Sequence, residues 1–154
     1  MEHKTEEERI VFEDPDPKNG FILLPDMKWD GKVESMYLLA IMHQKDIKSI
    51  RDLNGSHIEL LENVVEKGLA AIKQKYNVSR NKIRVYFHYF PSFYHLHVHF
   101  THINFESSSE RNYSIFRAIE NLKLDGDYFK KVALEIPIRK NEKLFELFKH
   151  KIED

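Results

Sequence analysis

Residues 83–105 read IRVYFHYFPSFYHLHVHFTHINF, and their pattern is the clearest indication of the fold. Over residues 83–88, apolar side chains alternate with more polar ones, which is the period of a half-buried β-strand. A Pro91-Ser92 turn follows, and the alternation resumes from Tyr94 to Phe105. Two alternating runs joined by a turn predict an antiparallel hairpin.

The other apolar patterns surround this hairpin with further strands and helices. They predict strands over 21–24, 36–42 and 132–138, and helices over 56–76, 113–122 and 143–152. Ser56 and Glu59 form the capping-box pattern that begins the longest helix. This mixture predicts an α+β fold, in which an antiparallel β-sheet is flanked by helices.

The length and composition suit one domain. The 154 residues are 42% hydrophobic, which is enough to build a core without disulfides or a structural metal. Residues 1–9 form a charged segment with almost nothing to bury, so we expect the folded domain to span residues 10–154. No cysteine is present, which suits a reducing compartment, and we expect a cytoplasmic or nuclear protein.

Charge and hydropathy exclude two classes of partner. Lys and Arg number 24 against 25 Asp and Glu, so the chain lacks the basic excess that holds a long nucleic acid. The charged N-terminus does not read as a signal peptide and no apolar run is long enough to span a bilayer, so we expect no membrane partner. A small anionic ligand in a local pocket is compatible with this balance.

The predicted strand carries three alternating histidines, His95, His97 and His99. Strand geometry sends their imidazoles to one face and the intervening apolar residues to the other. A neutral imidazole is a good nucleophile at phosphorus near neutral pH, and His97, at the centre, suits that role. Its second ring nitrogen needs an acceptor, and His95 and His99 are placed to donate to phosphate oxygens.

Two other interpretations of these histidines compete with catalysis. One histidine on an apolar strand is more often a core residue, but three in strict alternation are harder to dismiss. Alternating histidines also ligate zinc, yet the chain has no cysteine and this strand has no neighbouring carboxylate to complete a site. We therefore predict a site without metal or other cofactor.

Residues 95–100 resemble the signature of the histidine-triad family, in which the middle histidine is transiently nucleotidylated without a metal. The next position is commonly apolar in that family, and here it is Thr101, which matches the scavenger mRNA decapping branch. Further segments resemble that branch, so the resemblance covers nearly the whole chain; they are RIVFEDPDP (9–17), LPDMKW (24–29), IRDL (50–53) and RVYFHYFPS (84–92).

The resemblance implies the reaction as well as the fold. In that branch the substrate is the 7-methylguanosine cap on a short remnant of mRNA decay, joined by a triphosphate bridge. Attack at the phosphorus next to the methylguanosine releases methylguanosine monophosphate and a nucleoside diphosphate or short oligonucleotide. We therefore expect a hydrolase acting on a cap dinucleotide or short capped oligonucleotide through a covalent His97 intermediate.

The same resemblance implies the substrate-binding residues. Asp26 and Glu6 would accept hydrogen bonds from the guanine edge, whose donors suit carboxylates. Met27 would pack on one face of the methylated base. Four residues would bind the phosphate chain, and they are Lys28, His88, Ser92 and Arg111. Trp29 matches a separate packing residue of the family, and we do not assign it to the cap.

The resemblance also bears on assembly. Members of the branch carry a swapped N-terminal domain that closes over the cap, and they also have, upstream of the residues matched here, a Trp that stacks on the base. We expect this chain, a natural short form or a shortened one, to lack both. We expect a homodimer in which the sheet is extended across a two-fold axis, which would hide exposed strand edges.

Two other functions stay open on sequence grounds. A general histidine-triad hydrolase would cleave dinucleoside polyphosphates or other nucleotides regardless of the base, although Asp26 and the 25–29 segment argue against it. A cap-binding or dimerisation module would hold the cap with little turnover. The 7-methyl group separates these, because only a decapping domain both prefers it and releases product.

Overall fold

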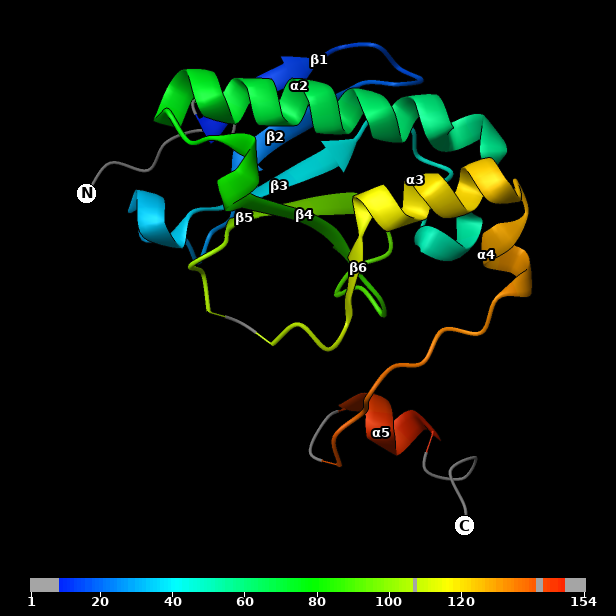
Figure 1. The fold of residues 1–154 in the computed structure, drawn as a ribbon. Coiled ribbons are helices and arrows are strands. Elements are labelled where there is room, and N and C mark those ends of the chain that lie inside the picture. The colour runs from blue at the N-terminus through cyan, green and yellow to red at the C-terminus, as the bar shows by residue number, and fades with distance from the viewer. Residues whose placement is uncertain (1–8, 107, 141–142, 149–154) are drawn as a thin grey trace.

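The computed structural model describes residues 9–106, 108–140 and 143–148. The strands are β1 (Phe12–Asp14), β2 (Phe21–Pro25), β3 (Tyr37–Met42), β4 (Ile83–His88), β5 (His97–His102) and β6 (Asn112–Ser114), and the helices are α2 (Ile58–Tyr76), α3 (Ile115–Leu124), α4 (Tyr128–Lys131) and α5 (Lys143–Phe148) (Figure 1). No helix within these ranges is both long enough and apolar enough to cross a bilayer.

The strands form one antiparallel sheet in the order β1-β2-β3-β5-β4-β6. The α+β class and the predicted hairpin are both confirmed, because β4 pairs with β5 with Tyr86 opposite His99. On its other side β5 pairs with β3, which places Leu39 opposite His99 and Ile41 opposite His97. The histidine strand therefore lies inside the sheet, with a neighbour on each side.

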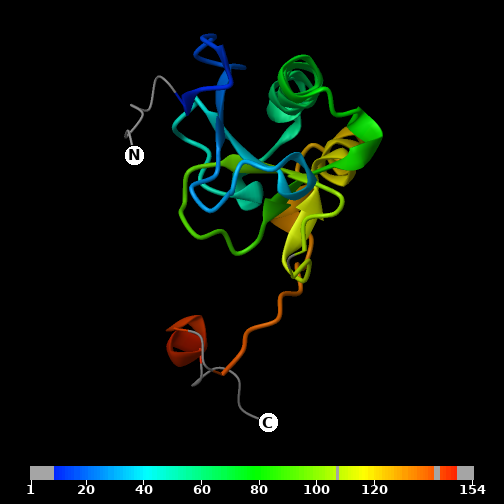
Figure 2. The same ribbon diagram turned by 90° about the vertical axis from the view of Figure 1, so that its left-hand side faces the viewer.

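The two faces of the sheet have different surroundings. Figures 1 and 2 show α2 and α3 together on one face. Alternate residues of β5, Val98 and Phe100, are fully buried on this covered face. His97 and His99 point to the opposite face, because side chains of a strand alternate between its faces. One strand thus serves the core and the open face at once.

The covered face is packed closely where α2 crosses β5. A Cβ atom placed on Gly68 would lie 2.6 Å from the tip of the Phe100 ring, closer than such atoms approach in proteins. Phe100 is fully buried, so its ring has little room to move. Glycine at this helical position lets α2 lie directly against the strand that carries the histidines.

The longest helix ends as predicted at Tyr76 but begins differently. Asn54, rather than Ser56, caps a short 3-10 turn over Gly55–His57, which leads into α2. The Asn54 side chain accepts from the Ser56 backbone amide at 2.8 Å, and the His57 ring accepts from the Asn54 amide at 3.1 Å. The predicted pairing of Ser56 with Glu59 was wrong because Asn54 satisfies the same kind of free amide two residues earlier.

The predicted helix over 113–122 is replaced by a strand and a later helix. β6 pairs with β4 through Tyr113, and α3 starts only at Ile115. The Ser114 side chain accepts hydrogen bonds from the backbone amides of Phe116 and Arg117, which fixes the helix start. An apolar pattern alone does not reveal this cap.

The predicted strand over 132–138 was wrong, because this segment has no regular structure. Its backbone carbonyls are satisfied by arginine side chains instead of a neighbouring strand. Arg51 donates to the carbonyl of Val132 at 2.6 Å, and Arg111 donates to that of Pro137 at 3.0 Å. Beyond it, α5 stands apart from the sheet (Figures 1 and 2), and residues 149–152 of the predicted last helix lie outside the described residues.

Candidate active site

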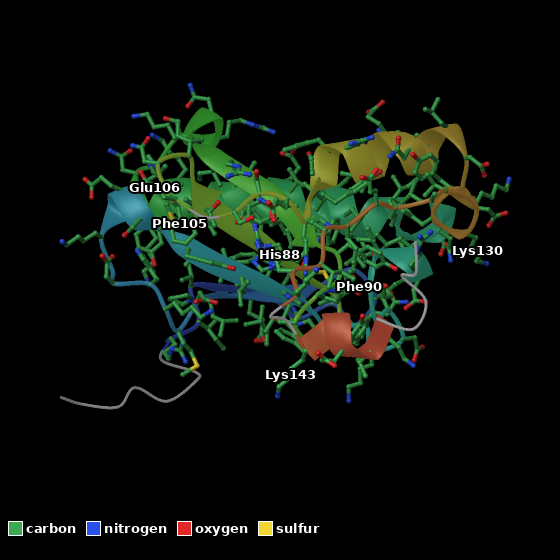
Figure 3. The ribbon with its side chains drawn as sticks, turned by 90° about the horizontal axis from the view of Figure 1, so that it is seen from below. His88, Phe90, Phe105, Glu106, Lys130 and Lys143 are labelled. Carbon is green, nitrogen blue, oxygen red and sulfur yellow. The ribbon has the colours of Figure 1, made fainter. Side chains whose placement is uncertain are left out.

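The uncovered face of the sheet carries the candidate site. His97 and His99 come from β5, Tyr37 from β3, and Tyr86 and His88 from β4. Figure 3, which views this face, shows His88 near its middle. The site is therefore built on three neighbouring strands, which hold its side chains more rigidly than loops would.

His97 is held in one tautomer by its own backbone surroundings. Its Nδ1 lies 2.8 Å from the backbone carbonyl oxygen of His95, and only an N–H can donate to that oxygen. The proton therefore sits on Nδ1 and leaves a lone pair on Nε2. Burial lowers the pKa of His97 below its ordinary value and outweighs the hydrogen bond to the His95 carbonyl, which raises that pKa, so the ring stays neutral at neutral pH.

An exposed aromatic ring covers His97. Phe93 stacks on the imidazole with ring centroids 4.0 Å apart and an interplanar angle of 11°. Phe93 is 43% exposed, whereas His97 is 4% exposed. The His97 ring therefore lies between the sheet and the solvent-exposed ring of Phe93.

His99 is the most deeply embedded histidine of the group. Its Nδ1 lies 2.7 Å from the Tyr37 hydroxyl, and its ring stacks on His88 with centroids 3.9 Å apart. Burial, with His88 and His97 adding to it, lowers the pKa of His99 to about 2. Its Nε2 is buried and has no hydrogen-bond partner among the described residues, which is costly unless a ligand supplies one.

His95 lies outside the strand, which begins at His97 rather than at Tyr94. Its Nε2 donates to the backbone carbonyl of Met42 at 2.7 Å. That nitrogen is therefore occupied and does not point its proton at a phosphate. His95 instead ties the loop before β5 to the end of β3, and its own carbonyl orients His97.

His88, Ser92 and Arg111 are brought together by the structure. They line a cavity of about 300 Å³ beside the histidines. Burial lowers the pKa of His88, and the charges of His97 and Arg111 lower it further. Arg139, which also lines the cavity, pairs with Glu110 at 3.0 Å. The cavity thus offers a cation and polar donors at one end of the site.

Asp26, Met27 and Lys28 follow β2, on the other side of β5. The Asp26 carboxylate accepts from the Lys28 backbone amide at 2.8 Å, which fixes the turn. The charge of Asp26 contributes to raising the pKa of Tyr37, after the larger effect of burial, so the carboxylate lies near the tyrosine that contacts His99. Met27 is 86% exposed, with its side chain available to a ligand.

Trp29 and Glu6 complete the set of residues singled out from the sequence. Trp29 packs its edge against Tyr76 with centroids 5.5 Å apart, and its indole N–H donates to the Lys32 carbonyl, as expected of a packing residue. Glu6 lies outside the described residues. Among the residues described, no three His, Asp or Glu side chains are grouped closely enough to hold a metal ion.

The arrangement combines a nucleophile with groups that bind anions. His97 presents a free lone pair, and Nε2 of His99 has no hydrogen-bond partner among the described residues. Such groups suit attack on phosphorus with stabilisation of the charge that develops on oxygen.

Sequence reasoning missed Tyr37, Tyr86 and Phe93. Tyr86 stacks on His99 with an interplanar angle of 7° and centroids 5.2 Å apart. Tyr37 lies in β3 and Tyr86 in β4, and the alternation within each strand does not show which residues of another strand they contact. Only the pairing of β3 and β4 with β5 brings both tyrosines to His99. Phe93 sits in a loop, where no periodicity reports its direction.

Known proteins resemble this chain over most of its length. A family model described as scavenger mRNA decapping enzyme C-term binding matches residues 1–114. An m7GpppX diphosphatase of Caenorhabditis elegans is 44% identical over 158 residues, covering 100% of this chain and 51% of the relative. Proteins of the same name from Sus scrofa and Homo sapiens are 44% and 43% identical over 151 residues, covering 96% of this chain and 45% of each relative.

The chain spans about half the length of the curated relatives it matches. A solved structure described as Hnt3 in complex with DNA and guanosine aligns with 93% of this chain and 87% of its own, at 18% identity and a TM-score of 0.44. That similarity is too low to support an argument about function.

Proposed function

The chain belongs to the scavenger mRNA decapping enzyme family, and we propose that it hydrolyses the triphosphate bridge of short capped mRNA remnants. The substrate is a 7-methylguanosine cap dinucleotide or a short capped oligonucleotide. The products are methylguanosine monophosphate and a nucleoside diphosphate or its oligonucleotide. The observation that carries this proposal is the Nδ1–H tautomer of His97, fixed by the His95 carbonyl.

The reaction proceeds in two displacements at one phosphorus. The Nε2 lone pair of His97 forms a bond to the phosphorus next to the methylguanosine, and the bond from that phosphorus to the bridging oxygen breaks. The nucleoside diphosphate leaves with the bridging oxygen. Water then attacks the same phosphorus, the N–P bond breaks, methylguanosine monophosphate departs, and the proton of the water passes to solvent.

Charge on the phosphate oxygens is stabilised by groups on both sides of His97. His99 donates from its unpartnered Nε2 to an oxygen of the reacting phosphate. His88, Ser92 and Arg111 hold the outgoing phosphates in the 300 Å³ cavity. Lys28, which follows β2, would bind the phosphates from that side of the site.

Recognition of the base rests on the turn after β2. The guanine N1–H and exocyclic amine donate to the Asp26 carboxylate, and the exposed Met27 side chain packs on the methylated ring. Glu6 would add a second acceptor. Because the methylated ring is cationic, a carboxylate also favours it over unmethylated guanine electrostatically.

We expect Asp26→Asn to lose about tenfold in kcat/KM on the methylated cap dinucleotide, the value of one charge-assisted hydrogen bond. Product release from methylated and unmethylated cap dinucleotides, resolved by chromatography, measures this. Asp127→Asn is the control, since Asp127 is an exposed acid beside α4. Equal cleavage of both dinucleotides by the unchanged chain would favour a general nucleotide hydrolase, and cap binding without product would favour a binding module.

We also propose a homodimer. The sheet has open edges at β1 and β6, and joining an edge to its copy across a two-fold axis would hide unpaired backbone groups. Light scattering of the purified chain should give twice the 18.5 kDa of one copy. A single-copy mass at micromolar concentration would contradict this.

A further inference from the structure

A second cavity, of about 480 Å³, lies where β4, β6 and the start of α3 meet. Its lining includes two arginines, Arg84 from β4 and Arg117 from α3. None of the residues expected from the family resemblance to bind substrate lines this cavity. Its chemistry therefore needs a separate explanation.

The two arginines lie against aromatic rings rather than against acids. Arg84 lies over the Tyr86 ring at 5.2 Å, and Arg117 lies over the Tyr113 ring at the same distance. Within the described residues, neither guanidinium pairs with a carboxylate. The side chains of Ser109 and Asn112 add polar groups to the lining. Both arginines contribute to the lining of this cavity, and guanidinium groups without a carboxylate partner are suited to binding a phosphate.

The cavity adjoins the candidate active site. Asn112 lines both this cavity and the one formed by His88, Ser92 and Arg111. Tyr86, another lining residue, stacks on His99. A substrate that extends from the histidines along the cavity of Arg111 would therefore reach the second cavity next.

The order of the strands indicates how the substrate is oriented across the sheet. Asp26 follows β2, on one side of β5, whereas both cavities lie toward β4 and β6, on the other side. With methylguanosine at Asp26 and the reacting phosphorus at His97, the leaving half of the substrate extends toward β6. The second cavity is then positioned for the part of the RNA beyond the first transcribed nucleoside.

We propose that Arg84 and Arg117 bind the first phosphodiester of the RNA that comes after the cap, so that the preferred substrate is a capped oligonucleotide rather than the bare cap dinucleotide. This inference rests on the proposed function, because it assigns the direction of the same substrate. A bare cap dinucleotide has no phosphodiester and leaves the second cavity empty.

The test compares three substrates that differ only beyond the cap. They are the methylated cap dinucleotide, the same cap dinucleotide extended by one further nucleotide, and that trinucleotide with a neutral methylphosphonate in place of the phosphodiester. We expect the charged trinucleotide to have a KM about fivefold lower than the other two, as for one solvent-accessible ion pair. Arg117→Gln should remove this advantage and leave kinetics on the cap dinucleotide unchanged.

Arg80→Gln is the matched control, because it removes the same charge from an exposed turn before β4. Equal KM values for the charged and neutral trinucleotides, or equal behaviour of the two arginine variants, would overturn the proposal. If no cap is cleaved, the proposed function fails, but calorimetric titration with an uncapped 5′-phosphorylated dinucleotide still tests the cavity. Weaker binding by Arg117→Gln than by Arg80→Gln would then support it, and equal binding, as when a second copy covers the cavity, would overturn it.

Discussion

His97→Asn is expected to lower kcat by at least about 10³-fold, because it removes the nucleophile on which both displacements depend. Asparagine can still donate from its amide to the His95 carbonyl, so the loop before β5 keeps its hydrogen bond. The thermal unfolding midpoint should change little. The loss of activity would then be caused by the missing nucleophile and not by misfolding of the variant.

Two measurements and one control variant separate this explanation from others. Mass spectrometry of acid-sensitive adducts, on reactions quenched under mild conditions, should find methylguanylate on the unchanged chain and not on the variant. His102→Asn, on the same strand, is the control, since the asparagine side chain can accept the hydrogen bond that the Asn104 backbone amide donates to His102. The acid limb of the rate profile should lie below pH 6.5, since burial depresses the pKa of His97 and activity falls as that ring is protonated. A variant with full turnover would refute the assignment.

Tyr37→Phe is expected to lower kcat by about 100-fold with little change in KM. We expect the Tyr37 hydroxyl to donate to Nδ1 of His99, 2.7 Å away, which would place the His99 proton on Nε2, where a phosphate oxygen can accept it. Without the hydroxyl, the buried Nδ1 loses its partner and the proton is free to move there. Nε2 would then face the substrate as an acceptor and repel the phosphate oxygen.

The ¹⁵N NMR signals of the histidine ring nitrogens report this tautomer directly. Labelled protein should show His99 as the Nε2–H form, and the variant should shift toward the Nδ1–H form. Tyr128→Phe, in α4, is the control for loss of a phenol hydroxyl. If kcat is reduced equally in both variants, or the ring signals do not move, Tyr37 has no positioning role.

The sequence was sufficient to predict the hairpin, the α+β class and the face on which His97 and His99 lie. Alternation along β5 determines the face, two alternating runs joined by a turn indicate the hairpin, and the mixture of strand and helix periods indicates the class. The sequence was not sufficient to place His95. The predicted strand began at Tyr94, but the His95 ring and carbonyl are both used to close the loop before β5. The alternation of side-chain types continues through that loop, although the strand conformation of the backbone does not.

The partners of His99 depend on contacts that no local pattern contains. Tyr37 is 62 positions away along the chain, and it reaches His99 only because β3 pairs with β5 in one register. A shift of one residue would turn Tyr37 toward α2. In the same way, the arginines that hold residues 132–137 come from distant segments, so the apolar pattern there wrongly predicted a strand.

The close fit of Gly68 against Phe100 has a consequence for how this chain can evolve. Phe100 is the immediate neighbour of His99 and points to the opposite side of the same strand. A bulkier residue at position 68 would push on that strand from behind and tilt the imidazole in front of it. Selection for catalysis therefore constrains a glycine that does not contact the substrate, and a larger residue at position 68 would be tolerated only together with a smaller side chain at position 100.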